Sequence, residues 1–129
     1  MLHDYARSSQ TPYIVFQNKK DHGDPNIVSI QKQIEENYSN SFNADKISKT
    51  HGMSRRTFER RFKKATQVTP LMYLQCVRVE VAKQLLETGL QTFDEISYQV
   101  GYEDSNFFRK VFVKQTGLRP KEYKMKFQR

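Results

Sequence analysis

Residues 54–67 read SRRTFERRFKKATQ and hold a dense cluster of positive charge. Six of these residues are Lys or Arg, and one is acidic. When the segment is drawn as a helix at about 100° per residue, Phe58, Phe62 and Ala65 fall on one side. Another side carries Arg55, Arg56, Glu59, Arg60 and Lys63. The pattern therefore predicts a helix that its Phe residues hold in place while a basic face stays exposed.

A short helix and a glycine turn precede this basic helix. The short helix is predicted over residues 44–50, and His51-Gly52-Met53 follows it. Glycine permits the positive φ that a tight turn between helices needs. A helix, a Gly-containing turn and a basic helix form the pattern of a helix-turn-helix, whose second helix enters the DNA major groove. A Lys- and Arg-rich helix can also be an ordinary solvated surface.

The chain makes this pattern twice. Five positions recur 50 residues later: Phe58, Phe62, Thr66, Pro70 and Tyr73 match Phe108, Phe112, Thr116, Pro120 and Tyr123. Before the turn the displacement is 49: Asp45, Ile47, Ser48 and Gly52 match Asp94, Ile96, Ser97 and Gly101. The second copy should therefore have one extra turn residue. Repetition of a whole supersecondary unit favours two helix-turn-helix units over a merely solvated basic helix.

Composition bounds the class of protein. With 129 residues and a mean hydropathy of −0.82, the chain is long enough for one or two small domains. No apolar run approaches the roughly 20 residues of a membrane span, and the first residues form no hydrophobic signal segment, which favours a cytoplasmic, nucleoid-associated location without membrane contact. The single cysteine, Cys76, cannot form an intrachain disulfide, and an incidental thiol is the favoured interpretation.

The net charge of +8 is unevenly distributed. Residues 1–53 are neutral in sum, and residues 68–103 carry a charge of −3. Residues 54–67 carry +5, and residues 104–129 carry +6. The excess positive charge thus follows the two predicted turns. Clustered cations beside two predicted groove-reading helices indicate a phosphate backbone as the partner, which means double-stranded DNA.

The N-terminal part of the chain is expected to lead into a covering helix. Residues 1–24 predict a linker, or the remnant of a preceding domain, with an apolar patch at 13–16 that has no strand to pair with. Asp24 and Pro25 then provide an N-cap and a first-turn proline for a helix that ends near Asn37. We expect this helix to cover the first helix-turn-helix unit.

A long helix is predicted between the two units. Thr69 and Pro70 open it, Gly89 ends it, and it covers residues 70–88. Its apolar positions predict one stripe: Tyr73, Leu74, Val77, Val81, Ala82 and Leu85. At 1.5 Å per residue the helix spans about 27 Å. That length is compatible with two recognition helices held one DNA turn, about 34 Å, apart.

The second unit begins at a capping box, in which Thr92 and Glu95 satisfy each other's backbone amides. It opens a helix over residues 93–100, which ends in the turn containing Gly101. Asp104 caps the second recognition helix, residues 105–116. The expected exposed positions of that helix are Ser105, Asn106, Arg109 and Lys110.

Phe107 allows two interpretations, because it stands beside the buried position Phe108. It could stack on a nucleic-acid base, but its helical spacing favours packing in or at the rim of the core. Gly117 ends the second recognition helix, and Pro120 opens a last helix that carries Tyr123 on its inner side.

Three strings resemble the DNA-binding module of the AraC/XylS transcription regulators: MSRRTFERRFKKAT, TPLMYLQCVRVEVAKQLLE and ISYQVGYEDSNFFRKVFVKQTGLRPKEY. The resemblance covers roughly residues 26–127. It implies an all-α fold of seven helices, in two helix-turn-helix subdomains joined by a long central helix, over residues 25–129. It also implies RNA polymerase as a partner and an N-terminal effector or dimerisation domain. RSSQTPYIVFQ and HGDPNIVSIQKQIEEN further resemble the subgroup whose N-terminal domain is of the DJ-1/PfpI, amidotransferase-like type.

The same resemblance implies which side chains contact DNA. In the first recognition helix they are Arg56, Glu59 and Arg60, flanked by Arg55. The position of Lys63, a turn further along this helix, predicts a phosphate contact for it. In the second helix they are Ser105, Asn106, Arg109 and Lys110. Arg suits guanine O6 and N7, Asn suits adenine, and a Glu carboxylate can accept from cytosine N4. Glu59 needs such a donor or an Arg neighbour, because phosphates repel it.

Other classes of function fit the sequence less well. The histidines His3, His22 and His51 lie in linker or turn positions without clustered carboxylates, so no catalytic or metal site assembles. No glycine-rich phosphate loop is present, and no cofactor is expected. The alternative is a non-specific nucleic-acid-binding or helical protein-interaction module. That alternative explains the basic charge but gives no reason for the 50-residue repeat.

Overall fold

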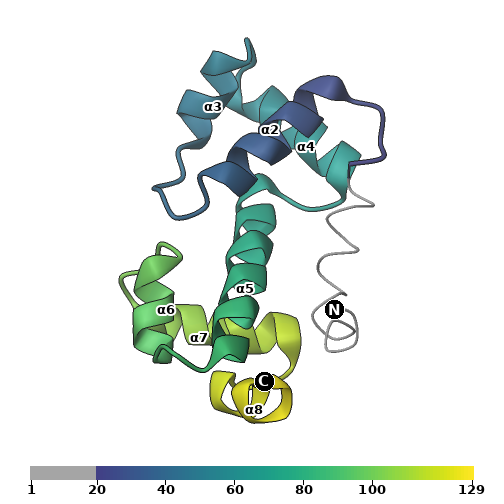
Figure 1. The fold of residues 1–129 in the computed structure, drawn as a ribbon. Coiled ribbons are helices and arrows are strands. Elements are labelled where there is room, and N and C mark those ends of the chain that lie inside the picture. The colour runs from purple at the N-terminus through teal and green to yellow at the C-terminus, as the bar shows by residue number, and fades with distance from the viewer. Residues whose placement is uncertain (1–19) are drawn as a thin grey trace.

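The computed structural model describes residues 20–129 as two helical units that share one long helix (Figure 1). This part of the chain contains seven α-helices and no strands. They are α2 (Pro25–Glu36), α3 (Ala44–Thr50), α4 (Arg55–Thr66), α5 (Pro70–Thr88), α6 (Phe93–Gln99), α7 (Ser105–Thr116) and α8 (Pro120–Phe127). The predicted all-α fold with a long central helix is confirmed. The apolar patch at 13–16 and most of the expected linker lie outside the described residues.

Capping residues set the helix boundaries. Six N-cap side chains accept a hydrogen bond from a first-turn backbone N–H: Asp24, Asn43, Ser54, Thr69, Thr92 and Asp104. The predicted capping box is complete, since Glu95 N donates to Thr92 Oγ1 at 3.1 Å and Thr92 N donates to Glu95 Oε1 at 2.8 Å. Prolines occupy the first turn of α2, α5 and α8, where no backbone N–H is needed.

Each unit has its own core, built around three aromatic rings. The rings are Phe58, Phe62 and Tyr73 in the first unit and Phe108, Phe112 and Tyr123 in the second. In each unit the middle Phe meets the other two rings edge-on. The centroid separations are 5.9 and 5.6 Å in the first unit and 6.4 and 5.7 Å in the second. The 50-residue repeat is therefore a repeat of core geometry.

The helix α5 belongs to both units, which corrects the predicted single stripe. Val81 and Leu85 are only half-buried, whereas Val79 and Leu86 are buried. The first half of α5 packs on the first core and the second half packs on the second core. At about 100° per residue the two sets of buried positions lie on nearly opposite faces of the helix. A helix that is buried on different faces along its length does not show a single apolar stripe in its sequence.

In the second unit α5 also takes the place that α2 takes in the first. Buried positions recur at a displacement of 52 residues: Ile27, Ile30, Gln31 and Ile34 of α2 match Val79, Ala82, Lys83 and Leu86 of α5. A carboxylate extends the match. The Tyr73 hydroxyl donates to Glu35 of α2, and the Tyr123 hydroxyl donates to Glu87 of α5 at 2.6 Å. The last helix of one unit is thus the first helix of the next.

The two helix-turn-helix turns share one geometry. Gly52 and Gly101 both adopt positive φ, +68° and +113°. The residue after each Gly donates its backbone N–H to a serine carbonyl: Met53 to Ser48 at 2.8 Å, and Tyr102 to Ser97 at 2.9 Å. Residues 51–54 separate α3 from α4, whereas residues 100–104 separate α6 from α7. The predicted extra turn residue is confirmed.

No helix among residues 20–129 combines the length and the apolarity needed to cross a membrane. Within the same residues, no group of three or more His, Cys, Asp and Glu side chains could hold a metal ion. His22 contacts Gln31 Oε1 at 2.9 Å, and His51 contacts the carbonyl of Ile47 at 3.0 Å. Both side chains therefore have local structural contacts.

Equivalent helix ends differ by one residue type, which gives a stability prediction. The residue after α4 is Gln67 and the residue after α7 is Gly117, and both adopt left-handed φ, 69° and 77°. We expect Gln67→Gly to raise the free energy of unfolding and Gly117→Ala to lower it, each by about 1 kcal/mol, because a side chain is strained in this conformation.

Urea unfolding followed by circular dichroism measures both changes. No atom lies within 4 Å of a Cβ built at Gly117, so the loss expected there comes from backbone conformation and not from a clash. Equal stability of both variants and the parent chain would contradict this reading of the repeat.

Candidate nucleic-acid interface

The sequence of α4 forces its charged side chains outward. Ser54 starts the helix, and its side-chain oxygen accepts from Thr57 N at 3.1 Å. Phe58 and Phe62 are fully buried in the first core. The opposite side of the helix then faces solvent and carries the five predicted side chains, all of them exposed: Arg55, Arg56, Glu59, Arg60 and Lys63.

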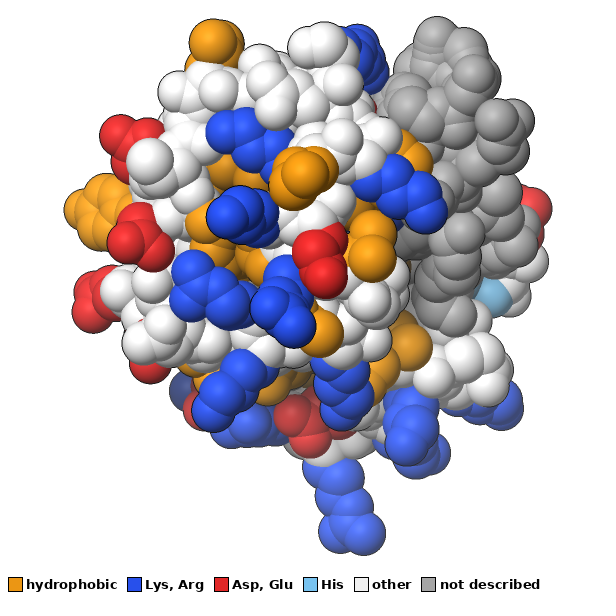
Figure 2. All heavy atoms as spheres, turned by 90° about the horizontal axis from the view of Figure 1, so that it is seen from below, with side chains coloured by type: hydrophobic (Ala, Val, Ile, Leu, Met, Phe, Trp, Pro, Cys, Tyr) orange, Lys and Arg blue, Asp and Glu red, His pale blue; other side chains and the backbone are white. Residues whose placement is uncertain are grey.

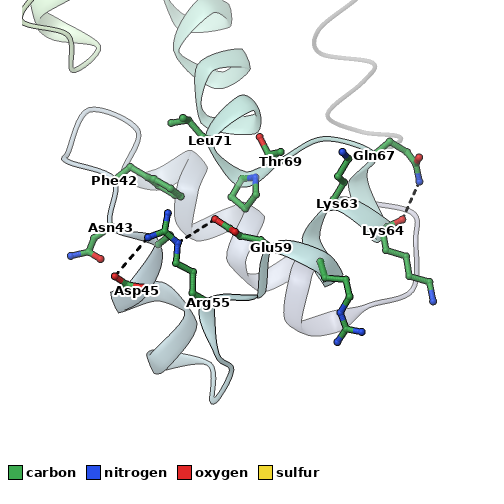
Figure 3. A pocket seen from close by; sticks show the side chains of 13 residues that line it. Phe42, Asn43, Asp45, Arg55, Glu59, Lys63, Lys64, Gln67, Thr69 and Leu71 are labelled. Carbon is green, nitrogen blue, oxygen red and sulfur yellow. Dashed lines mark hydrogen bonds and ion pairs between the residues drawn. The ribbon is translucent and has the colours of Figure 1, made fainter. Parts of the chain in front are cut away.

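Four of these five side chains line one open groove. The groove has a volume of about 960 Å³ and lies between α4 and the N-terminal ends of α3 and α5. Its polar lining includes Asp45, Arg55, Glu59, Arg60, Lys63 and Thr69. Figure 3 shows Glu59 and Lys63 projecting from α4 beside the start of α5. Arg56 is exposed on α4 but does not line this groove.

Glu59 is held by an arginine on the same helix. Arg55 Nε lies 3.3 Å from Glu59 Oε2, and Arg55 Nη1 lies 3.9 Å from Asp45 Oδ2 of α3 (Figure 3). All three side chains are about half exposed, so the pairs add little stability. They do supply the cationic neighbour that Glu59 needs near phosphates.

One cation of α4 points away from this face. Arg61 Nη2 donates to both carboxylate oxygens of Asp24, at 2.9 and 3.1 Å, and Arg61 Nη1 lies 3.4 Å from the sulfur of Met53. Asp24 is also the N-cap of α2. Arg61 therefore joins the recognition helix to the covering helix. The sequence repeat carries a signal of this contact. The position 50 residues after Arg61 is an apolar residue, Val111, which is buried in the second core.

The corresponding face of α7 is less open than predicted. Asn106 and Lys110 are exposed, but Ser105 and Arg109 are half-buried. The guanidinium carbon of Arg109 lies 5.3 Å from the ring centroid of Phe93, and its Nη1 donates to Asn106 Oδ1 at 3.0 Å. The predicted exposure is confirmed for Asn106 and Lys110 and is wrong for Ser105 and Arg109. For Arg109 the reason is that α6 places the ring of Phe93 beside α7. A stacked arginine keeps its charge but loses freedom.

Phe107 lies at the rim of the second core. Its side chain is 48% exposed, and its ring lies 5.9 Å from the ring of Tyr102 in the preceding turn. The buried ring is its neighbour Phe108. This arrangement agrees with the favoured interpretation of rim packing.

Much of the positive charge of the second unit lies beyond α7. The helix α7 carries Arg109, Lys110 and Lys114, whereas α8 and its flanks carry Arg119, Lys121, Lys124, Lys126 and Arg129. Figure 2 views the molecule from the α8 end and shows Lys and Arg side chains spread over that face. The second unit thus has a broad basic surface and a recognition helix with fewer cations than α4.

Comparison with known proteins gives a family for this architecture. Residues 47–126 match the family described as "Helix-turn-helix domain". An uncharacterized HTH-type transcriptional regulator of Pseudoalteromonas carrageenovora is 38% identical over 101 residues, which are 78% of this chain and 60% of the relative. The HTH-type transcriptional activator RhaR of Salmonella dublin is 33% identical over 98 residues, 76% of this chain and 33% of the relative. The chain therefore spans less than two thirds of either relative.

Solved structures agree with the sequence relatives. The DNA-binding domain of AdpA, solved in complex with a target DNA, is 31% identical with a TM-score of 0.70, covering 81% of this chain and 94% of that chain. A transcriptional regulator of the AraC-type DNA-binding class from Chromobacterium violaceum shares the fold at 24% identity, with a TM-score of 0.73 and coverage of 79% and 91%. The chain belongs to this helix-turn-helix domain family, and it shares its fold with the AraC-type regulator of Chromobacterium violaceum.

Proposed function

We propose that this chain is a sequence-specific DNA-binding transcription regulator that inserts α4 and α7 into consecutive major-groove faces of duplex DNA. The observation that carries this proposal is the duplicated unit, in which the same aromatic core presents one polar helix face in each half. A solvated basic helix would need no second copy with the same core. The family is one of DNA-binding domains rather than of enzymes.

The chemistry of α4 suits direct readout of bases. Arg56 and Arg60 can each donate two hydrogen bonds to guanine O6 and N7, and Glu59 can accept one from cytosine N4. Arg55 orients Glu59 and flanks it. Lys63 lies a turn further along the helix, where a phosphate contact is expected. We therefore assign base readout to the first half of α4 and phosphate contact to its second half.

The chemistry of α7 suits a narrower readout. Asn106 can pair with adenine N6 and N7, and Lys110 can donate to guanine or to a phosphate. Arg109 is stacked on Phe93, and Ser105 is half-buried. Both would contact DNA only at the edge of the groove face. We expect fewer specified base pairs under α7 than under α4, with the basic surface of α8 adding sequence-independent attraction.

The relatives extend the proposal from DNA binding to the regulation of transcription. RhaR is described as a transcriptional activator, and AdpA binds its target DNA. By analogy we propose activation through contact with RNA polymerase, in the cytoplasm and on the nucleoid. We also propose that residues 25–129 form the DNA-binding domain and residues 1–24 a linker. An effector or dimerisation domain, of the DJ-1/PfpI type by the resemblance of the N-terminal segment, would precede it in the full-length protein.

The first experiment tests whether both helices engage DNA. Hydroxyl-radical footprinting on a duplex recovered by selection should show two protected segments on one face, with centres about 10 bp apart, because one chain carries both recognition helices. A second bound copy should lengthen the footprint without changing the spacing inside each half. One short protected segment would mean that a single helix engages and that the second unit has another role.

The second experiment separates base readout from phosphate contact. Arg60→Ala should weaken cognate binding by about 1–3 kcal/mol and relax the preference at one base pair. Lys63→Ala should weaken cognate and scrambled duplexes by similar factors and lower the slope of log K against log salt by about 0.9. Salt titrations of both variants on both duplexes give the measurement.

Arg61→Gln is the matched control for that experiment. It removes a cation from the same helix, but one that is half-buried and paired with Asp24 of the α2 N-cap. We expect it to lower the stability of the first unit and to leave the salt slope unchanged. If Arg60→Ala weakened both duplexes equally while Lys63→Ala changed base preference, α4 would be rotated in the groove relative to this proposal.

A further inference from the structure

A buried arginine stands at the junction of the two units. Arg78 lies near the midpoint of α5 and is 6% exposed. A buried guanidinium is costly unless its N–H groups are satisfied. The contacts that satisfy Arg78 come from segments far from it in sequence and on both sides of the junction.

The first set of contacts belongs to the first unit. Arg78 Nε donates to the carbonyl of Tyr38 at 2.6 Å, and Arg78 Nη2 donates to the carbonyl of Asn40 at 2.9 Å. Both carbonyls lie in the segment between α2 and α3. The C-terminal end of a helix such as α2 carries partial negative charge, which favours a cation there. The planar guanidinium thus fixes the course of this segment against α5.

The second set of contacts belongs to the second unit. The guanidinium carbon of Arg78 lies 4.7 Å from the ring centroid of Tyr102, in the turn before α7. Tyr102 in turn stacks on Phe108 of α7, with 4.7 Å between centroids and 13° between planes. A chain of direct contacts therefore runs from the α2–α3 segment through Arg78 to the second recognition helix.

The backbones of the two units also approach each other at this point. A Cβ built on Gly101 would lie 2.8 Å from Arg78 Nη2 and 3.0 Å from the carbonyl of Ser39. The absence of a side chain at Gly101 thus leaves room for Arg78 between the α2–α3 segment and the turn before α7. The side chain of Tyr38 packs against both hydrophobic cores. Arg78 therefore sits at a point of direct contact between the two units.

We propose that Arg78 is a positioning residue that locks the orientation of α7 relative to α4, and so fixes the spacing and the rotational phase of the two DNA half-sites. A single unit does not require it, because the equivalent position in α2, 52 residues earlier, is the exposed Asn26. The two cores both pack on α5, and Arg78 adds a direct contact between the α2–α3 segment and the turn before α7. The part of the proposal that concerns DNA rests on the proposed function.

Residual dipolar couplings test the orientation without any DNA. In the parent chain, couplings from residues 20–69 and 90–129 should fit one alignment tensor. In Arg78→Met, which keeps an unbranched apolar side chain but no donor, the two units should give tensors of different magnitude or orientation. Arg78→Lys should deviate in the same direction, because a point cation offers no planar face for Tyr102 and no fork for two carbonyls. If Arg78→Met does not fold, Arg78→Lys decides.

Val79→Ala is the matched control. Val79 is the next residue of α5 and is buried in the second core alone. Its truncation should lower the stability, as a cavity does, while both units keep one tensor. A single tensor of parental orientation in the folded Arg78 variants would overturn the proposal. A split tensor in Val79→Ala would do the same, since any loss of stability would then loosen the junction.

Duplexes with changed half-site spacing test the consequence for DNA. One inserted base pair turns the second half-site by about 35°, given 10–10.5 bp per turn. The parent chain should then bind about tenfold or more weakly. Arg78→Met should bind the parental spacing less tightly and lose less on insertion. Equal insertion penalties would contradict the link to spacing. Failure of the parent chain to bind any selected duplex would refute the proposed function and leave the coupling result intact.

Discussion

The edge-to-face contact between two phenylalanines and a tyrosine is the interaction on which each unit depends. A pair of rings in this geometry contributes about 0.5–1.5 kcal/mol beyond the burial of its area. The middle ring comes from the recognition helix, and the tyrosine comes from the next helix. Fixing those rings inside decides which side of α4 and α7 faces outward. The position of the DNA-reading surface is therefore a consequence of core packing.

Two copies of one core have come to present different surfaces. Glu59 and Arg60 of α4 correspond to Arg109 and Lys110 of α7, so one position carries opposite charge in the two halves. Glu59 is paired with Arg55, and Arg109 is stacked on Phe93. The three-ring clusters can stay alike because Glu59, Arg60 and Lys110 are exposed, while Arg109 contacts Phe93, which packs on the outside of the second cluster. Shared packing with divergent faces is what an asymmetric binding site would require of a single chain.

Much of the fold could be predicted from the sequence, because prolines, caps and glycines act through local backbone chemistry and the aromatic repeat preserves residue identity. The correspondence of α2 with α5 could not be seen, since Glu35 and Glu87 are the one identical pair between them and the other matched positions share burial but not residue type. At the site, the exposed face of α4 was predictable from the Phe spacing. The inward turn of Arg61 toward Asp24 and the stacking of Arg109 on Phe93 depend on residues of other helices. Helical periodicity holds no information about such partners.

The central claim is that both recognition helices read one duplex in a fixed register. Selection of bound duplexes from a randomised double-stranded library, followed by sequencing, tests it most directly. The account predicts one asymmetric motif with two blocks of preferred bases whose centres lie about one helical turn, 10–10.5 bp, apart, with more information in one block than in the other. A motif with a single block, or no preference over random duplex, would contradict it.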